Sequence, residues 1–70
     1  MPERAFTLAS ARINAGFTQQ EAAKKLKVSP ATICNWENGK AYPNVKHVNA
    51  LCKLYGRKYD EIDFLPNYPL

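Results

Sequence analysis

Residues 17–40 of the chain read FTQQEAAKKLKVSPATICNWENGK, and this stretch decides the fold. Thr18 and Glu21 have the spacing of a capping box, in which each side chain bonds the backbone of the other residue at a helix start. Ser29 followed by Pro30 marks a second start, because serine is a favoured cap and proline fits the first helical position. Gly39 supplies a stop. The stretch therefore predicts two short helices joined by a tight turn.

The same start and stop signals recur outside this stretch, and no segment shows the period-2 alternation of a half-buried strand. Thr7 is the predicted cap of a helix over about 8–15, and Asn44 is the cap of a helix over about 45–55. A short last helix is expected over about 59–64. The chain is thus predicted to be one all-α domain over residues 1–70, with five helices within about 7–65 and an irregular tail at 66–70.

The helix after Ser29 divides into two faces when successive residues are turned by about 100°. Ile33, Trp36 and Glu37 share the face that must pack against the first two helices. The opposite face and its rim carry no charge; the residues are Pro30, Ala31, Thr32, Cys34, Asn35 and Asn38. Exposed helix faces more often carry Lys and Glu. A short uncharged face after a tight turn is the arrangement that places a helix in the major groove of DNA.

Charge supports this interpretation without deciding it. The net charge is +4, and all ten Lys and Arg residues lie between Arg4 and Lys58. The last stretch instead carries Asp60, Glu61 and Asp63. A basic body suits a polyanionic partner on one face, and it suits a solvated lysine-rich surface equally well.

Several other classes of protein are disfavoured. No apolar run approaches a membrane span, and the start MPERAF lacks the pattern of a signal peptide. Cys34 and Cys52 match no zinc-ligand spacing, and two free thiols favour the reducing cytosol. We therefore expect a cytoplasmic protein with no metal, no cofactor and no small-molecule ligand.

Catalysis is also disfavoured. His47 is the only histidine, and no Ser, Cys or carboxylate can be placed beside it in the order that a catalytic triad needs. A lone histidine at a helix start is more often a surface residue than a base. The chain is therefore predicted not to be an enzyme.

Several motifs in register resemble one family. These are AR-x-x-x-G at Ala11–Gly16, TQ-x-E-x-A at Thr18–Ala23, WENGK at Trp36–Lys40 and LYGRKYDEIDFL at Leu54–Leu65. Together they resemble the Cro/CI-type (Xre-like) helix-turn-helix family of phage repressors and small bacterial transcriptional regulators. The resemblance covers about residues 7–65. It implies a lambda-repressor-like fold of five helices and a phage- or prophage-type regulator, with a repressor favoured over an activator.

The resemblance also assigns roles to individual residues. The positions that face bases or the adjoining phosphates are Pro30, Ala31, Thr32 and Asn35. The positions that contact backbone phosphates are Gln19, Asn38 and Lys40, with Ser29 acting first as a cap. Arg12 and Glu37 match an ion pair that ties the first helix to the end of the third. Asn35 is the one side chain at the centre of the outward face that can pair bidentately with a base, typically adenine.

Three residues depart from the family pattern. Lys27 stands where a glycine commonly closes the second helix, and a left-handed backbone there would cost about 1 kcal/mol or slightly more. Pro30 stands at the start of the third helix, where the family pattern has a long polar side chain that can contact bases. Cys34 stands where a polar residue is expected. We expect a fold that is intact and a base readout that is sparse.

Assembly and partners follow from the same resemblance. One recognition helix covers too few base pairs to be selective, so a homodimer on a palindromic operator is expected, with half-sites about 34 Å apart. The fifth helix and the tail are the expected contact surface. The alternative is a module that acts mainly through a protein partner, such as the DNA-binding half of an antitoxin or a coactivator.

Overall fold

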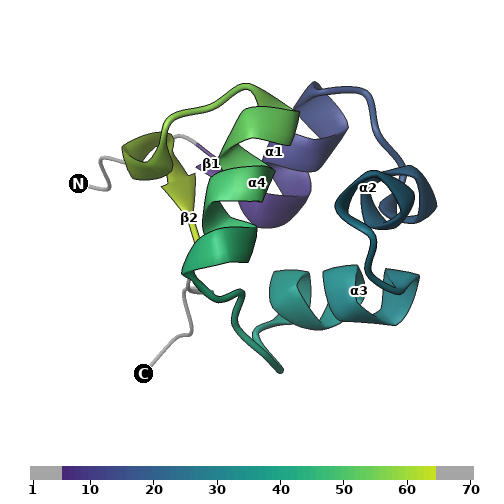
Figure 1. The fold of residues 1–70 in the computed structure, drawn as a ribbon. Coiled ribbons are helices and arrows are strands. Elements are labelled where there is room, and N and C mark those ends of the chain that lie inside the picture. Colours follow the sequence, from purple (N-terminus) through teal and green to yellow (C-terminus); the bar gives the residue numbers. More distant parts are fainter. Residues whose placement is uncertain (1–5, 65–70) are drawn as a thin grey trace.

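The computed structural model describes residues 6–64, and within them four α-helices form most of the fold (Figure 1). The helices are α1 (Leu8–Asn14), α2 (Gln19–Leu26), α3 (Pro30–Asn38) and α4 (Val45–Tyr55). A short 3-10 helix, η1 (Tyr59–Glu61), and two short strands, β1 (Phe6–Thr7) and β2 (Ile62–Asp63), complete the described elements. None of the helices in this range is long and apolar enough to cross a membrane.

Each α-helix begins at its predicted cap. The side chain of each cap accepts a hydrogen bond from the backbone N–H three residues further on; the caps are Thr7, Thr18, Ser29 and Asn44. Such a bond satisfies one of the donors that a helix start leaves unpaired. The predicted bounds are confirmed to within a residue, since the first helix ends at Asn14 and Ala15 is its C-terminal cap.

The predicted fifth helix is wrong. Tyr59–Glu61 form a single 3-10 turn, after which Ile62 takes an extended backbone at φ −111° and ψ 130°. β2 pairs in parallel with β1, so that Phe6 aligns with Ile62 and Thr7 with Asp63. The extended backbone finds hydrogen-bond partners in this ladder while Ile62 becomes fully buried. The fold is therefore mostly helical, as predicted, but it has four α-helices and a small two-stranded sheet in place of five helices.

The core lies where the four helices meet, and Figure 1 shows α4 in front of α1 with α2 and α3 beside them. Its buried members are Leu8, Ala11, Ala22, Ala23, Ile33, Trp36, Leu51, Tyr55 and Ile62. Of the residues predicted to face inward from the third helix, Ile33 and Trp36 are buried and Glu37 is partly buried, and Leu26 and Cys52 lie partly buried at the margin of the core. Phe64 also packs against this core, whereas Leu65 and the tail at 66–70 lie outside the described residues.

A basic side chain ties the two ends of the described chain together. The guanidinium carbon of Arg57, just after α4, lies 4.4 Å from the centre of the Phe6 ring. One guanidinium nitrogen donates to Asn14 Oδ1 over 2.7 Å. A cation over an aromatic face contributes about 0.5–1 kcal/mol at a partly exposed site. Arg57 therefore supports the short sheet that replaced the expected helix.

Candidate nucleic-acid interface

The turn between α2 and α3 fixes the angle between the two helices. Lys27 ends α2 in the left-handed conformation at φ 61° and ψ 41°, and its N–H bonds to the carbonyls of Ala23 and Lys24. Among the described residues it is the only one other than glycine with a positive φ. The left-handed backbone considered from sequence is therefore present, and lysine carries the cost that glycine would avoid.

α3 is anchored on one side and open on the other. Ile33 and Trp36 are buried, which fixes the rotation of the helix about its axis. The ribbon runs along one edge of the molecule, with its far side uncovered by any other described element (Figure 1). The open side and its rim hold the predicted residues: Pro30, Ala31 and Asn38 are exposed, and Thr32, Cys34 and Asn35 are partly exposed.

Most polar groups on this side already have a partner within the chain. Ser29 Oγ accepts from the Thr32 N–H over 3.2 Å and lies 3.0 Å from Thr32 Oγ1. Asn38 Nδ2 donates to Cys34 Sγ over 3.2 Å. The side-chain amide of Asn35, by contrast, makes no hydrogen bond to any residue in 6–64. Both the donor and the acceptor of this partly exposed side chain are therefore unengaged within the described residues.

A network of hydrogen bonds centred on Glu37 joins the first three helices. Arg12 Nε lies 2.8 Å from Glu37 Oε2, and the two side chains are only 12% and 8% exposed. Gln19 Nε2 donates to Glu37 Oε1 over 2.9 Å. A further nitrogen of Arg12 donates to the Phe17 carbonyl over 2.8 Å. The carboxylate thus accepts from α1 and α2, and it holds α3 against both.

The resemblance had paired Arg12 with Glu37 and had implied that Gln19 braces the third helix, and the bond from Gln19 to Glu37 provides that brace across 18 residues. The bond from Arg12 to the Phe17 backbone carbonyl was not predicted, because a local sequence pattern contains no signal for it. Their consequence is that the start of α2 cannot shift without disturbing α3.

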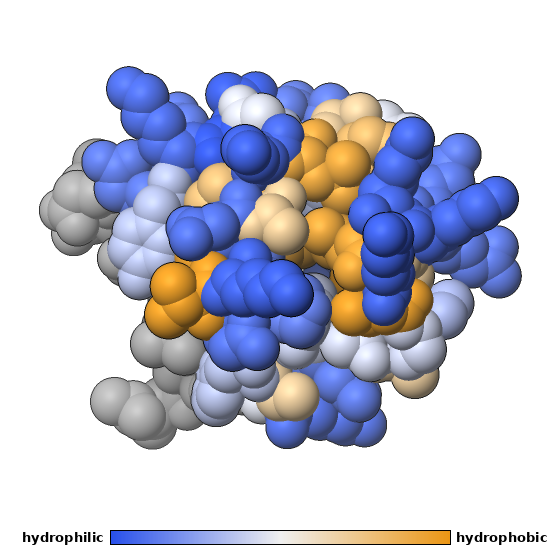
Figure 2. Space-filling view, in the orientation of Figure 1, coloured by the Kyte–Doolittle hydropathy of each residue, from blue (hydrophilic) through white to orange (hydrophobic). Residues whose placement is uncertain are grey.

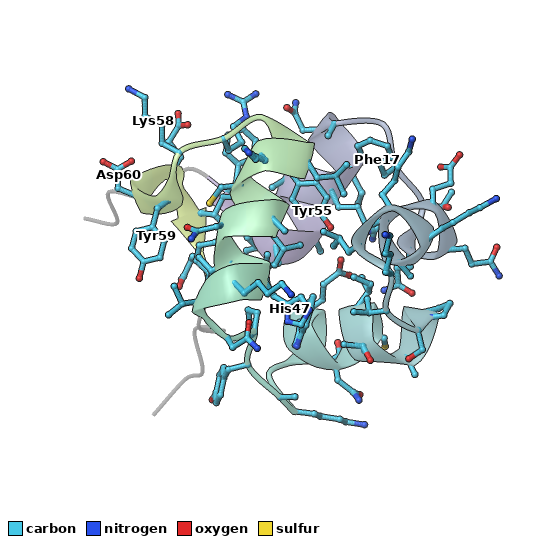
Figure 3. All side chains as sticks on the ribbon, in the orientation of Figure 1. Phe17, His47, Tyr55, Lys58, Tyr59 and Asp60 are labelled. Atoms are coloured by element: carbon cyan, nitrogen blue, oxygen red, sulfur yellow. The ribbon has the colours of Figure 1, made fainter. Side chains whose placement is uncertain are left out.

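Tyr55 of α4 lies behind this network, and its ring centre is 6.4 Å from that of Phe17 (Figure 3). Burial raises the pKa of Tyr55 to about 12, and the Glu37 carboxylate adds to the rise while the Arg12 guanidinium opposes it. The phenol is therefore neutral over the physiological range. Burial likewise raises the pKa of Cys52, so this thiol is not activated.

Lys40 follows the end of α3, and His47 of α4 contacts α3 through Trp36. Lys40, which is exposed, follows the left-handed Gly39, and its N–H bonds to the Asn35 carbonyl over 2.9 Å. His47, interpreted from sequence as a surface residue, is partly buried, and its ring centre lies 5.1 Å from that of Trp36. Figure 3 shows His47 between α4 and α3.

The described residues contain no group of three or more side chains that could hold a metal ion.

Comparison with known proteins agrees with this geometry. Residues 8–62 match the family model described as helix-turn-helix. The HTH-type transcriptional activator BcrR of Enterococcus faecalis is 35% identical over 51 residues, which are 73% of this chain and 25% of that protein. The chain therefore spans about a quarter of the length of this relative. No solved structure matches the chain.

Proposed function

The chain belongs to the helix-turn-helix family, and on that premise we propose that it binds operator DNA with α3 in the major groove and so regulates transcription. The observation that carries the proposal is the contrast between the two sides of α3. Its inner side is fixed by Ile33, Trp36 and the Glu37 network, and its outer side is uncharged with one unengaged amide. A rigid helix with such a face can lie closely against base edges.

Base reading falls mainly to Asn35. A carboxamide can pair bidentately with adenine N6 and N7 in the major groove. Ala31 and Pro30, both exposed in the first turn, offer apolar contact to a thymine methyl group. The Thr32 hydroxyl reaches a base edge or a phosphate once it exchanges its contact with Ser29.

Phosphate contacts supply the rest of the affinity. We assign these to Gln19 and Ser29 at the starts of α2 and α3, and to Asn38 and Lys40 at the far end of α3. Gln19 has one amide hydrogen committed to Glu37, which orients its remaining polar atoms. Contacts of this kind position the protein on the duplex without reading sequence.

We propose a repressor, of the phage or prophage type, that binds as a homodimer to a palindromic operator in the cytoplasm. Repression needs only that the bound protein exclude the polymerase, so the DNA interface is sufficient for it. The relative named above is an activator, which makes the sign of regulation a direct experimental question.

The proposal is tested by selecting bound duplexes from a random pool and sequencing them. Enrichment of a two-fold symmetric site is expected. Failure to enrich any sequence would refute DNA reading and favour a module that acts through a protein partner.

Two variants then distinguish a residue that recognises bases from a residue that only positions the protein on the DNA backbone. Asn35→Ala should cost about 1–3 kcal/mol and relax the preference at one base pair. Lys40→Ala should weaken all sequences alike and lower the salt slope by about one. Equal loss on selected and random DNA for Asn35→Ala would remove this residue from the readout.

A further inference from the structure

An exposed isoleucine lies near the end of α1, beside the loop that leads to α2. Ile13 is 65% exposed, and it lines an open hollow together with Phe17 and Gln20. Its side chain has no polar atom for water to bond, so burial against a partner is favourable. A single exposed apolar residue is normal on a protein surface, and it indicates an interaction site only where other features adjoin it.

Two hollows meet at Phe17, which packs against the core with part of its ring exposed. The first hollow has a volume of about 610 Å³ and extends from Ile13 over the loop to the start of α2. The second has a volume of about 520 Å³ and is bordered by the outward side chains of α2. We call these two hollows and their rim the α1–α2 surface; its residues are Ile13, Phe17, Gln20, Glu21, Lys24 and Lys25.

The α1–α2 surface lies away from the outer side of α3. Figure 3 shows Phe17 beside α2, on the side opposite α3. Figure 2, in the same orientation, shows apolar surface between α4 and α2, with hydrophilic side chains along its α2 edge. An occupant can therefore cover this surface while α3 stays open for the proposed contact with DNA. It approaches the duplex only where the first hollow ends at Gln19.

The α1–α2 surface has an excess of positive charge, with two lysines and one glutamate. Lys24 and Lys25 are exposed, and neither side chain forms an ion pair or a hydrogen bond with any residue in 6–64. Glu21 Oε1 accepts from the Thr18 N–H over 2.8 Å, so this carboxylate is engaged at the start of α2. Carboxylates of a partner are therefore complementary to the two lysines.

These features together fit a protein segment better than DNA or a second copy of the chain. A DNA backbone offers charge, but it offers no apolar side chain for the hollow beside Ile13. A second copy has the same net charge of +4, so the two copies repel one another over most of their surface. An acidic segment with large apolar side chains complements both the hollows and the lysines.

We propose that the α1–α2 surface docks an acidic segment of a partner protein. Large apolar side chains of the segment occupy the hollows on the two sides of Phe17, and its carboxylates lie against Lys24 and Lys25. The proposal goes beyond operator binding and does not depend on it. Exposed ion pairs contribute little, and both hollows are open, so the contact is weak and reversible.

Three short synthetic peptides test the proposal in the absence of DNA. The acidic peptide has Leu and Phe among Glu residues, the basic peptide has Lys in place of every Glu, and the third has Ala in place of Leu and Phe. Amide chemical shifts of the whole chain are followed up to about 1 mM peptide. The acidic peptide should shift residues of the α1–α2 surface. The other two should bind at least about tenfold more weakly, because each lacks one complementary feature.

Charge reversal tests the two lysines. The double variant Lys24→Glu, Lys25→Glu should bind the acidic peptide about tenfold more weakly and the basic peptide more tightly. The gain for the basic peptide also shows that the variant is folded. Lys46→Glu with Lys53→Glu is the matched control, since both lysines are exposed on α4 and line neither hollow. It should change each affinity by less than about twofold at physiological salt, where distant charges are screened.

Serine substitution tests the apolar part of the surface. Ile13→Ser should weaken binding of the acidic peptide by at least about threefold, because the buried apolar area is lost while the lysines remain. Val45→Ser is the matched control, since Val45 is 77% exposed and lines neither hollow. This control should leave the affinity unchanged.

Four results would overturn the proposal. The first is the absence of shifts with the acidic peptide at about 1 mM, and the second is an equal loss in the α4 control, which would reduce the effect to net charge. The third is self-association in sedimentation equilibrium that the Lys24 and Lys25 reversal abolishes, which would identify a second copy as the occupant. The fourth is a loss of affinity for random duplexes with a lower salt slope in the same variant, which would identify phosphate contacts. Failure to enrich an operator leaves the peptide measurements intact, so the two proposals fail separately.

Discussion

Replacing Lys27 by glycine should stabilise the protein. The left-handed conformation costs an L-residue about 1–2 kcal/mol, and Lys27 occupies it at φ 61° and ψ 41°. Glycine avoids this cost but loses more backbone freedom on folding, by about 0.5–1 kcal/mol. The difference is a gain of about 0.5–1 kcal/mol in the free energy of unfolding. For a domain of this size the gain corresponds to a rise of about 2–8 °C in Tm.

Urea titration and thermal unfolding of three variants separate backbone strain from charge. Lys27→Gly relieves the strain and removes the charge. Lys27→Ala removes the charge, which lies near Lys24 and Lys25, and keeps the strain. Lys27→Asn also removes the charge, but asparagine tolerates the left-handed region better than alanine. The expected order of stability is glycine first, asparagine next, and alanine close to the unmodified chain.

Two results would refute this reasoning. If Lys27→Ala gained as much as Lys27→Gly, the effect would come from reduced repulsion among the lysines of α2. If Lys27→Gly lost stability, the lysine side chain would contribute more to the folded state than the backbone costs. The first result would mean that the turn between α2 and α3 is not a strained element of the fold, and the second would mean that side-chain contacts of Lys27 outweigh the strain.

Three further predictions concern the network behind α3. Glu37→Ala should lower the free energy of unfolding by about 3 kcal/mol, because it leaves the Arg12 guanidinium without its carboxylate in a largely buried site. A loss below about 1 kcal/mol, measured by urea titration, would mean that the ion pair is effectively solvated. Because the folded-state pKa of Tyr55 is raised to about 12, its neutral form stabilises the fold below pH 10, and this contribution should be lost as the pH rises from about 10 to 12. Tyr55→Phe should unfold less steeply over that window, and identical pH profiles of the two proteins would contradict the assignment. Gln19→Ala should weaken binding to selected and random duplexes alike. Gln20→Ala, at an exposed neighbouring position, should leave binding unchanged. Equal effects of the two substitutions in a binding titration would exclude a specific role for Gln19.

The helix bounds could be predicted because their signals are local. Each cap and the backbone N–H that it accepts from lie within one turn, as for Ser29 and Thr32. The left-handed stops at Gly39 and Gly56 are likewise single-residue effects. These signals do not depend on how the helices pack, and so they survive unchanged in the folded chain.

The short sheet could not be predicted because its partners lie at opposite ends of the described chain. Ile62 and Phe64 have the spacing of one strand side, whereas Ile62 and Leu65 have the spacing of a helix face, and only the pairing with β1 decides between the two. One turn of helix is also costly to form alone, whereas a strand beside β1 gains ladder bonds and buries Ile62. Long-range backbone pairing therefore prevailed over local spacing.

Under the proposed function, one copy of α3 offers limited selectivity for a DNA sequence. A specific site is typically bound about 4–10 kcal/mol more tightly than random DNA. In the proposed mode of binding, the unengaged amide of Asn35 supplies about 1–3 kcal/mol of discrimination, and apolar contacts of Ala31 and Pro30 add less. A single copy therefore falls short of a useful margin, and two copies on a palindrome reach the lower part of it.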